Sequence, residues 1–135
     1  MILKTYARVF TNDADQALAT FQALHGREPH LRLRFGEWDL IGIGDTFIVG
    51  GTDAALAPIR DSHGPWIVED LDEAERRLLR AGATITQPAA ASPTGRFLYA
   101  RHADGLLVEY VEWTPELVEK FIRAPLREGL LSSQL

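Results

Sequence analysis

Apolar residues recur along this chain with two different periods, and the longer period predicts two similar helices. Within 10–26 and 67–82, apolar side chains return every three or four positions, as they do on one face of a helix. Each segment has an Asp three residues before a Gln or Glu, which is typical of a helix start, and a closing glycine, which is typical of a helix end. The shared order of these signals indicates an internal repeat.

The shorter period, an alternation of apolar and polar residues, predicts strands around each helix. In both halves, one such run precedes the helix and three follow it. The runs are 5–11, 31–35, 38–43 and 46–50 in the first half, and 64–69, 83–86, 95–101 and 106–113 in the second. Each half is therefore predicted to be a βαβββ unit.

We expect a single α+β domain over 1–135, in which two tandem βαβββ modules form a cupped mixed sheet and a short C-terminal helix follows. The first module spans 1–50, a linker with glycine and proline spans 51–63, the second module spans 64–113, and the last helix and tail span 114–135. Thr114 is the predicted N-cap of that helix, with Pro115 in its first turn. Because one helix covers only one face of each sheet, the two open faces can enclose a binding cup.

The composition narrows the classes of partner. The formal net charge is −5 and no run of Lys or Arg is present, which argues against a nucleic-acid partner and favours a small-molecule ligand. The absence of cysteine excludes disulfides and thiolate metal sites, so a metal would need His, Asp, Glu or backbone ligands. The N-terminal segment has no apolar run long enough for a signal peptide or a membrane span, so we expect a cytoplasmic protein without a membrane partner.

The run 106–113 carries the most distinctive candidate side chain, Glu109. Alternation places Glu109, Val111 and Trp113 on one face of that strand, toward the cup. A carboxylate among apolar neighbours is partly desolvated, which raises its pKa and suits it to act as an acid or a base. The alternative is an ion pair inside the cup with an arginine such as Arg8 or Arg101.

The first strand supplies a second candidate group. Tyr6, Arg8 and Phe10 are expected to share the face toward the cup. An arginine between two aromatic rings suits an anionic or planar ligand, through charge-assisted hydrogen bonds and stacking. The alternative for Arg8 is a solvated charge on an edge strand.

Three segments resemble a known family: Asp-Leu-Asp-Glu-Ala at a helix start (70–74), Ala-Gly-Ala-Thr-Ile at its exit (81–85), and Asp-Gly-Leu-Leu-Val-Glu-Tyr-Val-Glu in the last strand (104–112). Within tandem βαβββ units, these segments are similar to the vicinal oxygen chelate superfamily, which includes glyoxalases, bleomycin-resistance proteins and extradiol dioxygenases. The resemblance covers about 3–113 and implies the cupped fold and a homodimer. It leaves the activity open, because the family contains enzymes as well as metal-free drug-binding proteins.

The resemblance also implies where a metal would bind. In metal-dependent members, each module supplies one ligand from its first strand and a Glu from its last. Carried over by position, the pattern selects Tyr6 and Ile48 in the first module, and His63 and Glu109 in the second. Only His63 and Glu109 are usual ligands, and a divalent ion needs about three from the protein. A divalent metal cofactor is therefore not favoured.

Two classes of function remain, together with a third in which the chain is a structural or regulatory dimer module. The first is a metal-independent protein that binds an aromatic or anionic small molecule in the cup. Its expected lining is Tyr6, Arg8, Phe10, Ile48, His63, Glu109, Val111 and Trp113. The second is an enzyme, either a metal-dependent lyase, isomerase or dioxygenase that uses His63 and Glu109, or a metal-free one with Glu109 as the base.

Overall fold

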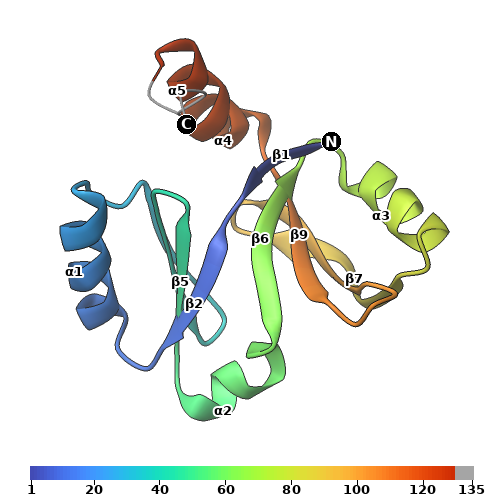
Figure 1. The fold of residues 1–135 in the computed structure, drawn as a ribbon, viewed down its shortest axis with the longest axis horizontal. Helices are drawn as coiled ribbons and strands as arrows, with labels where there is room; N and C mark the ends of the chain where they lie inside the picture. Colours follow the sequence, from blue (N-terminus) through green and yellow to red (C-terminus); the bar gives the residue numbers. More distant parts are fainter. Residues whose placement is uncertain (130–135) are drawn as a thin grey trace.

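The computed structural model describes residues 1–129, which form two sheets with the long helices on their outer sides (Figure 1). The strands are β1 (Ile2–Thr5), β2 (Ala7–Thr11), β3 (Leu31–Phe35), β4 (Trp38–Ile43), β5 (Thr46–Gly50), β6 (Ser62–Val68), β7 (Thr84–Ser92), β8 (Gly95–Arg101) and β9 (Leu107–Trp113). The helices are α1 (Ala14–His25), α2 (Asp53–Leu56), α3 (Leu71–Arg80), α4 (Pro115–Val118) and α5 (Ala124–Arg127), with a 3-10 turn η1 (Ala57–Ile59) and a π-helical turn η2 (Glu119–Arg123).

The internal repeat is confirmed by the strand order. The first module pairs its strands as β2-β5-β4-β3, and the second pairs them as β6-β9-β8-β7, with β1 added beside β6. In each module the first and last strands are parallel and the remaining pairs are antiparallel. The expected α+β fold of two tandem βαβββ modules is thus confirmed.

The first strand of the chain links the two sheets. Its β1 part pairs with β6 of the second module, and its β2 part pairs with β5 of the first. Tyr6 lies at the break between the two parts. In Figure 1, β2 and β6 run side by side at the centre of the molecule, so the open faces of the two sheets lie toward each other.

Helix ends follow the local signals in the sequence. The Asp13 side chain accepts a hydrogen bond from the backbone N–H of Gln16, and Asp70 does the same for Glu73, so both aspartates are N-caps as predicted. Gly26 ends α1 in the left-handed conformation, which costs glycine little because it has no Cβ.

The alternation along β9 divides its side chains between two apolar clusters. Val111 and Trp113 lie in the cluster between the sheets, and Val108 and Tyr110 lie in the cluster beneath α3. The predicted division of this strand is therefore confirmed. A third cluster, under α1, contains Ile41, Ile43 and Ile48.

Two strands differ in extent from the prediction. β6 begins at Ser62, inside the segment expected to be linker, and the rest of that segment forms α2 and η1. β7 continues to Ser92 although it contains Pro88. Proline is tolerated in edge strands and at bulges, and Pro88 lies in the outer strand of its sheet, within an irregularity of the register between Gln87 and Ala90.

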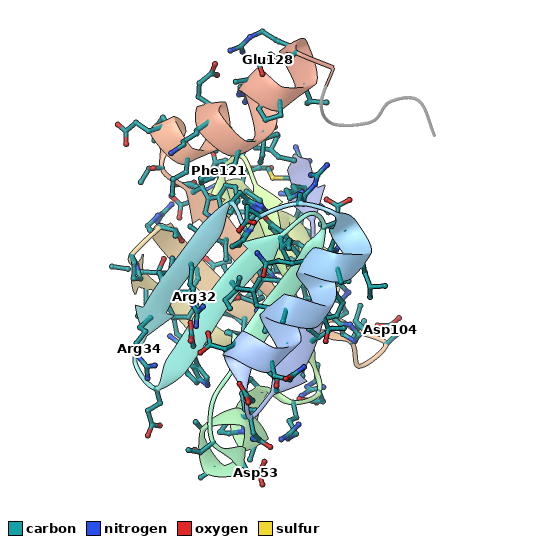
Figure 2. All side chains as sticks on the ribbon, turned by 90° about the vertical axis from the view of Figure 1, so that its left-hand side faces the viewer. Arg32, Arg34, Asp53, Asp104, Phe121 and Glu128 are labelled. Atoms are coloured by element: carbon teal, nitrogen blue, oxygen red, sulfur yellow. The ribbon has the colours of Figure 1, made fainter. Side chains whose placement is uncertain are left out.

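The chain continues after β9 into a helical segment at one end of the sheets. The Thr114 hydroxyl accepts a hydrogen bond from the Leu117 N–H, so the predicted N-cap is confirmed. Figure 2 shows Phe121 between this segment and the strands, with Asp53 of α2 at the opposite end. The predicted tail after residue 129 lies outside the described residues. Within 1–129, no helix has the length and apolar character needed to span a bilayer.

Candidate functional site

A cavity of about 450 Å³ lies between the facing sheets. Its size falls in the range of small-molecule pockets, roughly 300–1,000 Å³. Its lining comes from both modules and from η1: Arg8, Phe35, Trp38, Leu40, Val49, Pro58, Ile59, Thr86, Gln87, Phe97, Tyr99, Arg101, Leu107 and Glu109. The cavity is therefore mainly apolar and aromatic, with a few polar groups.

A buried ion pair between Arg8 and Glu109 joins the two modules inside the cavity. Arg8 Nη2 donates to Glu109 Oε1, and the side chains are only 3% and 16% exposed. Arg8 points inward because its neighbour Val9 packs under α1, and alternate residues of a strand face opposite sides. The ion-pair alternative for Glu109 is thus the one observed, with Arg8 as the partner.

Arg8 is held by three further hydrogen bonds. Nε donates to the Gly64 carbonyl at 3.2 Å, and Nη1 donates to Ser62 Oγ at 2.8 Å and to Tyr99 Oη at 3.1 Å. Each guanidinium nitrogen therefore has a partner within the protein. Its charge is also neutralised by Glu109, so Arg8 offers little to an anionic ligand.

Glu109 keeps one oxygen for other contacts. Within residues 1–129, only Oε1 accepts a hydrogen bond, which leaves Oε2 for water or a ligand in the cavity. Burial raises the pKa of the Glu109 carboxyl, and the contact with Arg8 opposes that shift. Burial also raises the pKa of the neighbouring Tyr99 phenol, so its hydroxyl stays protonated at neutral pH.

Four aromatic rings form a continuous wall around this polar pair. Ring centroids lie 6.4 Å apart for Phe35 and Trp38, 5.6 Å for Phe35 and Phe97, and 6.3 Å for Phe97 and Tyr99. Trp38 is also fixed by its indole N–H, which donates to the Ala55 carbonyl at 3.0 Å. We refer to Trp38, Phe35, Phe97 and Tyr99 as the aromatic wall. Edge-to-face and tilted contacts of this kind suit a planar ligand.

The expectation that His63 faces the cup is wrong. In the parallel β6–β9 register, His63 is aligned with Val108, which is buried beneath α3. His63 is therefore on the α3 face of the sheet, opposite Glu109, and is exposed. The reason is an irregularity in the register between His63 and Trp66, which places Ser62 rather than His63 toward Arg8.

Ile48 also lies on the wrong face for the expected lining. It aligns with Val9 in the β2–β5 register and is buried under α1. The transfer by position failed because the two strands present their inward residues in different phase: Phe47 is the second residue of β5, whereas Glu109 is the third residue of β9. Phe47 and Val49 face the other sheet instead.

The remaining expected lining residues face inward but contribute differently. Phe10 packs against the inter-sheet cluster and is not among the residues that border the main cavity. Val111 and Trp113 are buried, and together with Glu109 they border a second hollow of about 40 Å³. Sequence reasoning missed Ser62, Tyr99 and the Phe35–Phe97 pair, because their roles come from contacts between strands far apart in the chain.

Tyr6 belongs to the core rather than to the cavity. Its ring is 3% exposed and packs on Phe47 and Trp113, and a 2.6 Å hydrogen bond joins its hydroxyl to His30 Nε2. Burial raises the pKa of the Tyr6 phenol. Burial, together with the charges of Lys4 and Arg27, lowers the pKa of His30 to about 4.

Acidification below pH 6.5 is expected to destabilise the fold through His30. The unfolded chain binds a proton at His30 near pH 6.5, whereas the folded chain does so only near pH 4. Between these values the unfolded state holds more protons. The free energy of unfolding therefore decreases as the pH is lowered, by at most about 1.4 kcal/mol per pH unit. Urea unfolding at pH 7 and pH 5 measures this loss. The loss of unfolding free energy between pH 7 and pH 5 should be smaller in His30→Gln. An unchanged pH dependence in that variant would exclude His30 as the cause of the loss.

The four positions selected for a metal do not fit one. Tyr6 is engaged with His30, Ile48 has no donor atom, and His63 and Glu109 lie on opposite faces of their sheet. Glu109 is in addition paired with Arg8. Within 1–129, no group of three or more His, Cys, Asp or Glu residues is arranged to hold a metal ion. The geometry thus contradicts the expected pairing of His63 and Glu109 as metal ligands.

Comparison of the chain with protein-family models and with curated proteins gives no match. Among solved structures, an uncharacterized protein from Methanosarcina mazei is similar, with a TM-score of 0.76 and 28% identity over 84% of this chain and 94% of its own. Methylmalonyl-CoA epimerase from Mycobacterium tuberculosis has a TM-score of 0.66 and 19% identity, over 87% and 92% of the two chains. The Streptomyces coelicolor methylmalonyl-CoA epimerase, solved as a variant with 2-nitronate-propionyl-CoA, has a TM-score of 0.66 and 14% identity, over 85% and 97%.

These similarities establish the fold. Methylmalonyl-CoA epimerase is a member of the vicinal oxygen chelate superfamily, and the present chain has the fold of that superfamily. At identities below 25%, the likeness to the epimerases extends to architecture alone. The chemistry of the cavity therefore has to be inferred from its own side chains.

Proposed function

We propose that this protein binds a small neutral aromatic molecule in the main cavity, where a hydroxyl or amine of the ligand donates a hydrogen bond to Glu109 Oε2. The observation that carries the proposal is the engagement of all three guanidinium nitrogens of Arg8, by Glu109, Ser62, Tyr99 and Gly64, which uses four of its five N–H donors. The sequence allowed an aromatic or an anionic ligand. Because the charge of Arg8 is paired with Glu109 and four of its five N–H donors are used, the aromatic ligand is favoured.

The aromatic wall supports this choice of ligand. A planar molecule can contact Trp38 and Phe35 from the first module and Phe97 and Tyr99 from the second. Burial of such a molecule is favoured by about 25 cal/mol per Å² of apolar surface. The single free carboxylate oxygen would then fix its orientation, since directional polar groups in an apolar pocket set specificity.

Phenol is expected to bind more tightly than benzoate, its anionic counterpart. Phenol can donate to Glu109 Oε2, whereas the benzoate carboxylate would face the Glu109 carboxylate. Within residues 1–129, the two arginines that line the cavity are already paired, Arg8 with Glu109 and Arg101 with Asp61. Binding can be followed by tryptophan fluorescence, because Trp38 lines the cavity while Trp66 packs beneath α3 and Trp113 lies in the core. Trp38→Phe should abolish the signal, and tighter binding of benzoate would contradict the proposal.

Glu109→Gln should reverse this preference. Phenol binding should weaken by about tenfold, since a hydrogen bond to a charged group contributes about 1.5–3 kcal/mol, whereas one to the neutral amide oxygen contributes about 0.5–1.5 kcal/mol. Arg8 then carries an uncompensated charge, so benzoate binding should strengthen. His63→Ala is the matched control: it removes the other residue once selected for the cup, but it lies on the opposite face and should leave both ligands unchanged.

Metal-independent proton transfer by Glu109 is a second candidate, favoured by the burial that raises the pKa of this carboxyl. Methylmalonyl-CoA, which appears in the names of two structural neighbours, is the first compound to try. Exchange of its C2 proton in deuterated water, lost in Glu109→Gln, would support this activity. Absence of exchange together with phenol binding would favour the binding function alone.

A further inference from the structure

The cup contains a second, smaller hollow that the main cavity does not include. Its volume is about 40 Å³, and its walls include Leu31, Leu33, Phe47, Val111 and Trp113. One water needs roughly 10–15 Å³ in such a space, so the hollow has room for a methyl or ethyl group. Its predominantly apolar walls suit a hydrocarbon better than a polar group.

The order of residues along β9 shows how the two spaces are related. Leu107 borders the main cavity but not the small hollow, Glu109 borders both spaces, and Val111 and Trp113 border the small hollow but not the main cavity. Alternate residues of a strand lie on one face about 6.6 Å apart, so the two spaces follow one another along the strand. Glu109 is therefore at their junction.

An aromatic pair stands at the same junction. Phe35 of β3 and Phe97 of β8 both border the two spaces, and their rings meet edge to face at 82° with centroids 5.6 Å apart. The two phenylalanines come from different sheets, so their contact closes the cup between the modules. Both side chains are only half-buried, which leaves their rings more freedom to move than fully packed core residues have.

From this arrangement, we infer that Phe35 and Phe97 are specificity-determining residues that limit the ligand to a short apolar branch beside its hydrogen-bond donor. This inference rests on the proposed function. A ligand whose donor contacts Glu109 and whose ring lies against the aromatic wall can reach the small hollow only from a position next to the donor. The corresponding ligand class is an ortho-alkylated phenol or aniline. A para-alkyl group points away from Glu109 and cannot enter the hollow.

The inference is tested with a series of 2-alkylphenols, with the 4-alkylphenols as matched control ligands. For the unmodified protein, affinity should rise about fourfold per methylene buried up to 2-ethylphenol and then fall at 2-butylphenol. Phe97→Ala opens the junction, so 2-butylphenol should bind at least tenfold more tightly than it does to the unmodified protein. The 4-alkylphenols lose the same contact with the Phe97 ring and gain no new space, so their affinity should fall, and the preference for 2-butylphenol over 4-butylphenol should rise.

Two further variants keep the test decisive. Phe35→Ala removes the other ring and should produce the same shift in preference. It replaces Phe97→Ala in the test if that variant does not fold. Phe21→Leu changes a phenylalanine that packs under α1 and should leave both series unchanged. If phenol itself does not bind, the proposed function fails. If phenol binds but neither junction variant alters the preference for 2-alkyl chain length, the inference fails while the proposed function stands.

Discussion

Replacing Arg8 with methionine is expected to lower the free energy of unfolding by about 3–5 kcal/mol, because it leaves the Glu109 carboxylate buried without its partner. Ser62 and Tyr99 lose a hydrogen-bond donor in the same variant. The total stability of a domain is typically about 5–15 kcal/mol, so this change removes a large share of it. Urea or guanidinium unfolding, followed by tryptophan fluorescence, measures the loss.

The double variant Arg8→Met/Glu109→Leu is the matched control. It removes both charges and fills the space with apolar side chains, and replacing a whole buried ion pair in this way is often close to neutral. We expect it to recover most of the stability lost in Arg8→Met. If Arg8→Met instead costs less than about 1 kcal/mol, the pair contributes no more than a surface ion pair does, which would contradict its burial.

Gly64→Ala is expected to have the second large effect, because this glycine lies against the backbone that carries Glu109. A Cβ at Gly64 would come within 2.8 Å of the Glu109 carbonyl oxygen, and φ here is +121°. Forced overpacking costs about 1–3 kcal/mol, in addition to about 1–2 kcal/mol for a side chain at positive φ. Separation of β6 from β9 would also displace the Gly64 carbonyl that accepts from Arg8.

Gly105→Ala isolates the steric part of this effect. Gly105 also has positive φ, at +98°, but a Cβ added there would meet no atom within 4 Å. Gly64→Ala should therefore unfold at lower denaturant than Gly105→Ala, by about 1–3 kcal/mol in unfolding free energy. Phenol binding should weaken in Gly64→Ala only. Equal stabilities of the two variants would mean that β6 yields easily at this position.

Features set by neighbouring residues could be predicted from the sequence. The caps at Asp13, Asp70 and Thr114 depend on side chains within a few positions, and the division of β9 depends on simple alternation. The βαβββ repeat followed from these local signals. The inward orientation of Arg8 and the position of Glu109 between the sheets could also be predicted from simple alternation.

Features set by pairing between distant strands could not be predicted in the same way. The face that His63 occupies depends on an irregularity in the β6–β9 register, and the face of Ile48 depends on the register in which β5 pairs with β2. An error of one residue moves a side chain to the other side of a sheet. Both erroneous assignments arose from carrying positions over along the chain, and both placed an expected lining residue on the wrong face of its sheet.

The Arg8–Glu109 pair lies between these two cases. Sequence reasoning placed both side chains in the cup and offered the ion pair as one alternative, with Arg8 or Arg101 as the partner. The structure gives Arg8 that role, whereas Arg101 contacts Asp61 and the Gly105 carbonyl. What one sequence could not supply is the set of contacts from Ser62, Gly64 and Tyr99 that holds the guanidinium in place.

A crystal structure of the protein soaked with phenol would test the central claim most directly. The account predicts that the ring lies against the aromatic wall, that its hydroxyl lies about 2.5–3.0 Å from Glu109 Oε2, and that the Arg8–Glu109 pair stays intact. If phenol binds elsewhere and the main cavity stays empty, the proposed binding mode is wrong. A bound ligand for which Arg8 abandons Glu109 and becomes the direct contact would also contradict the account.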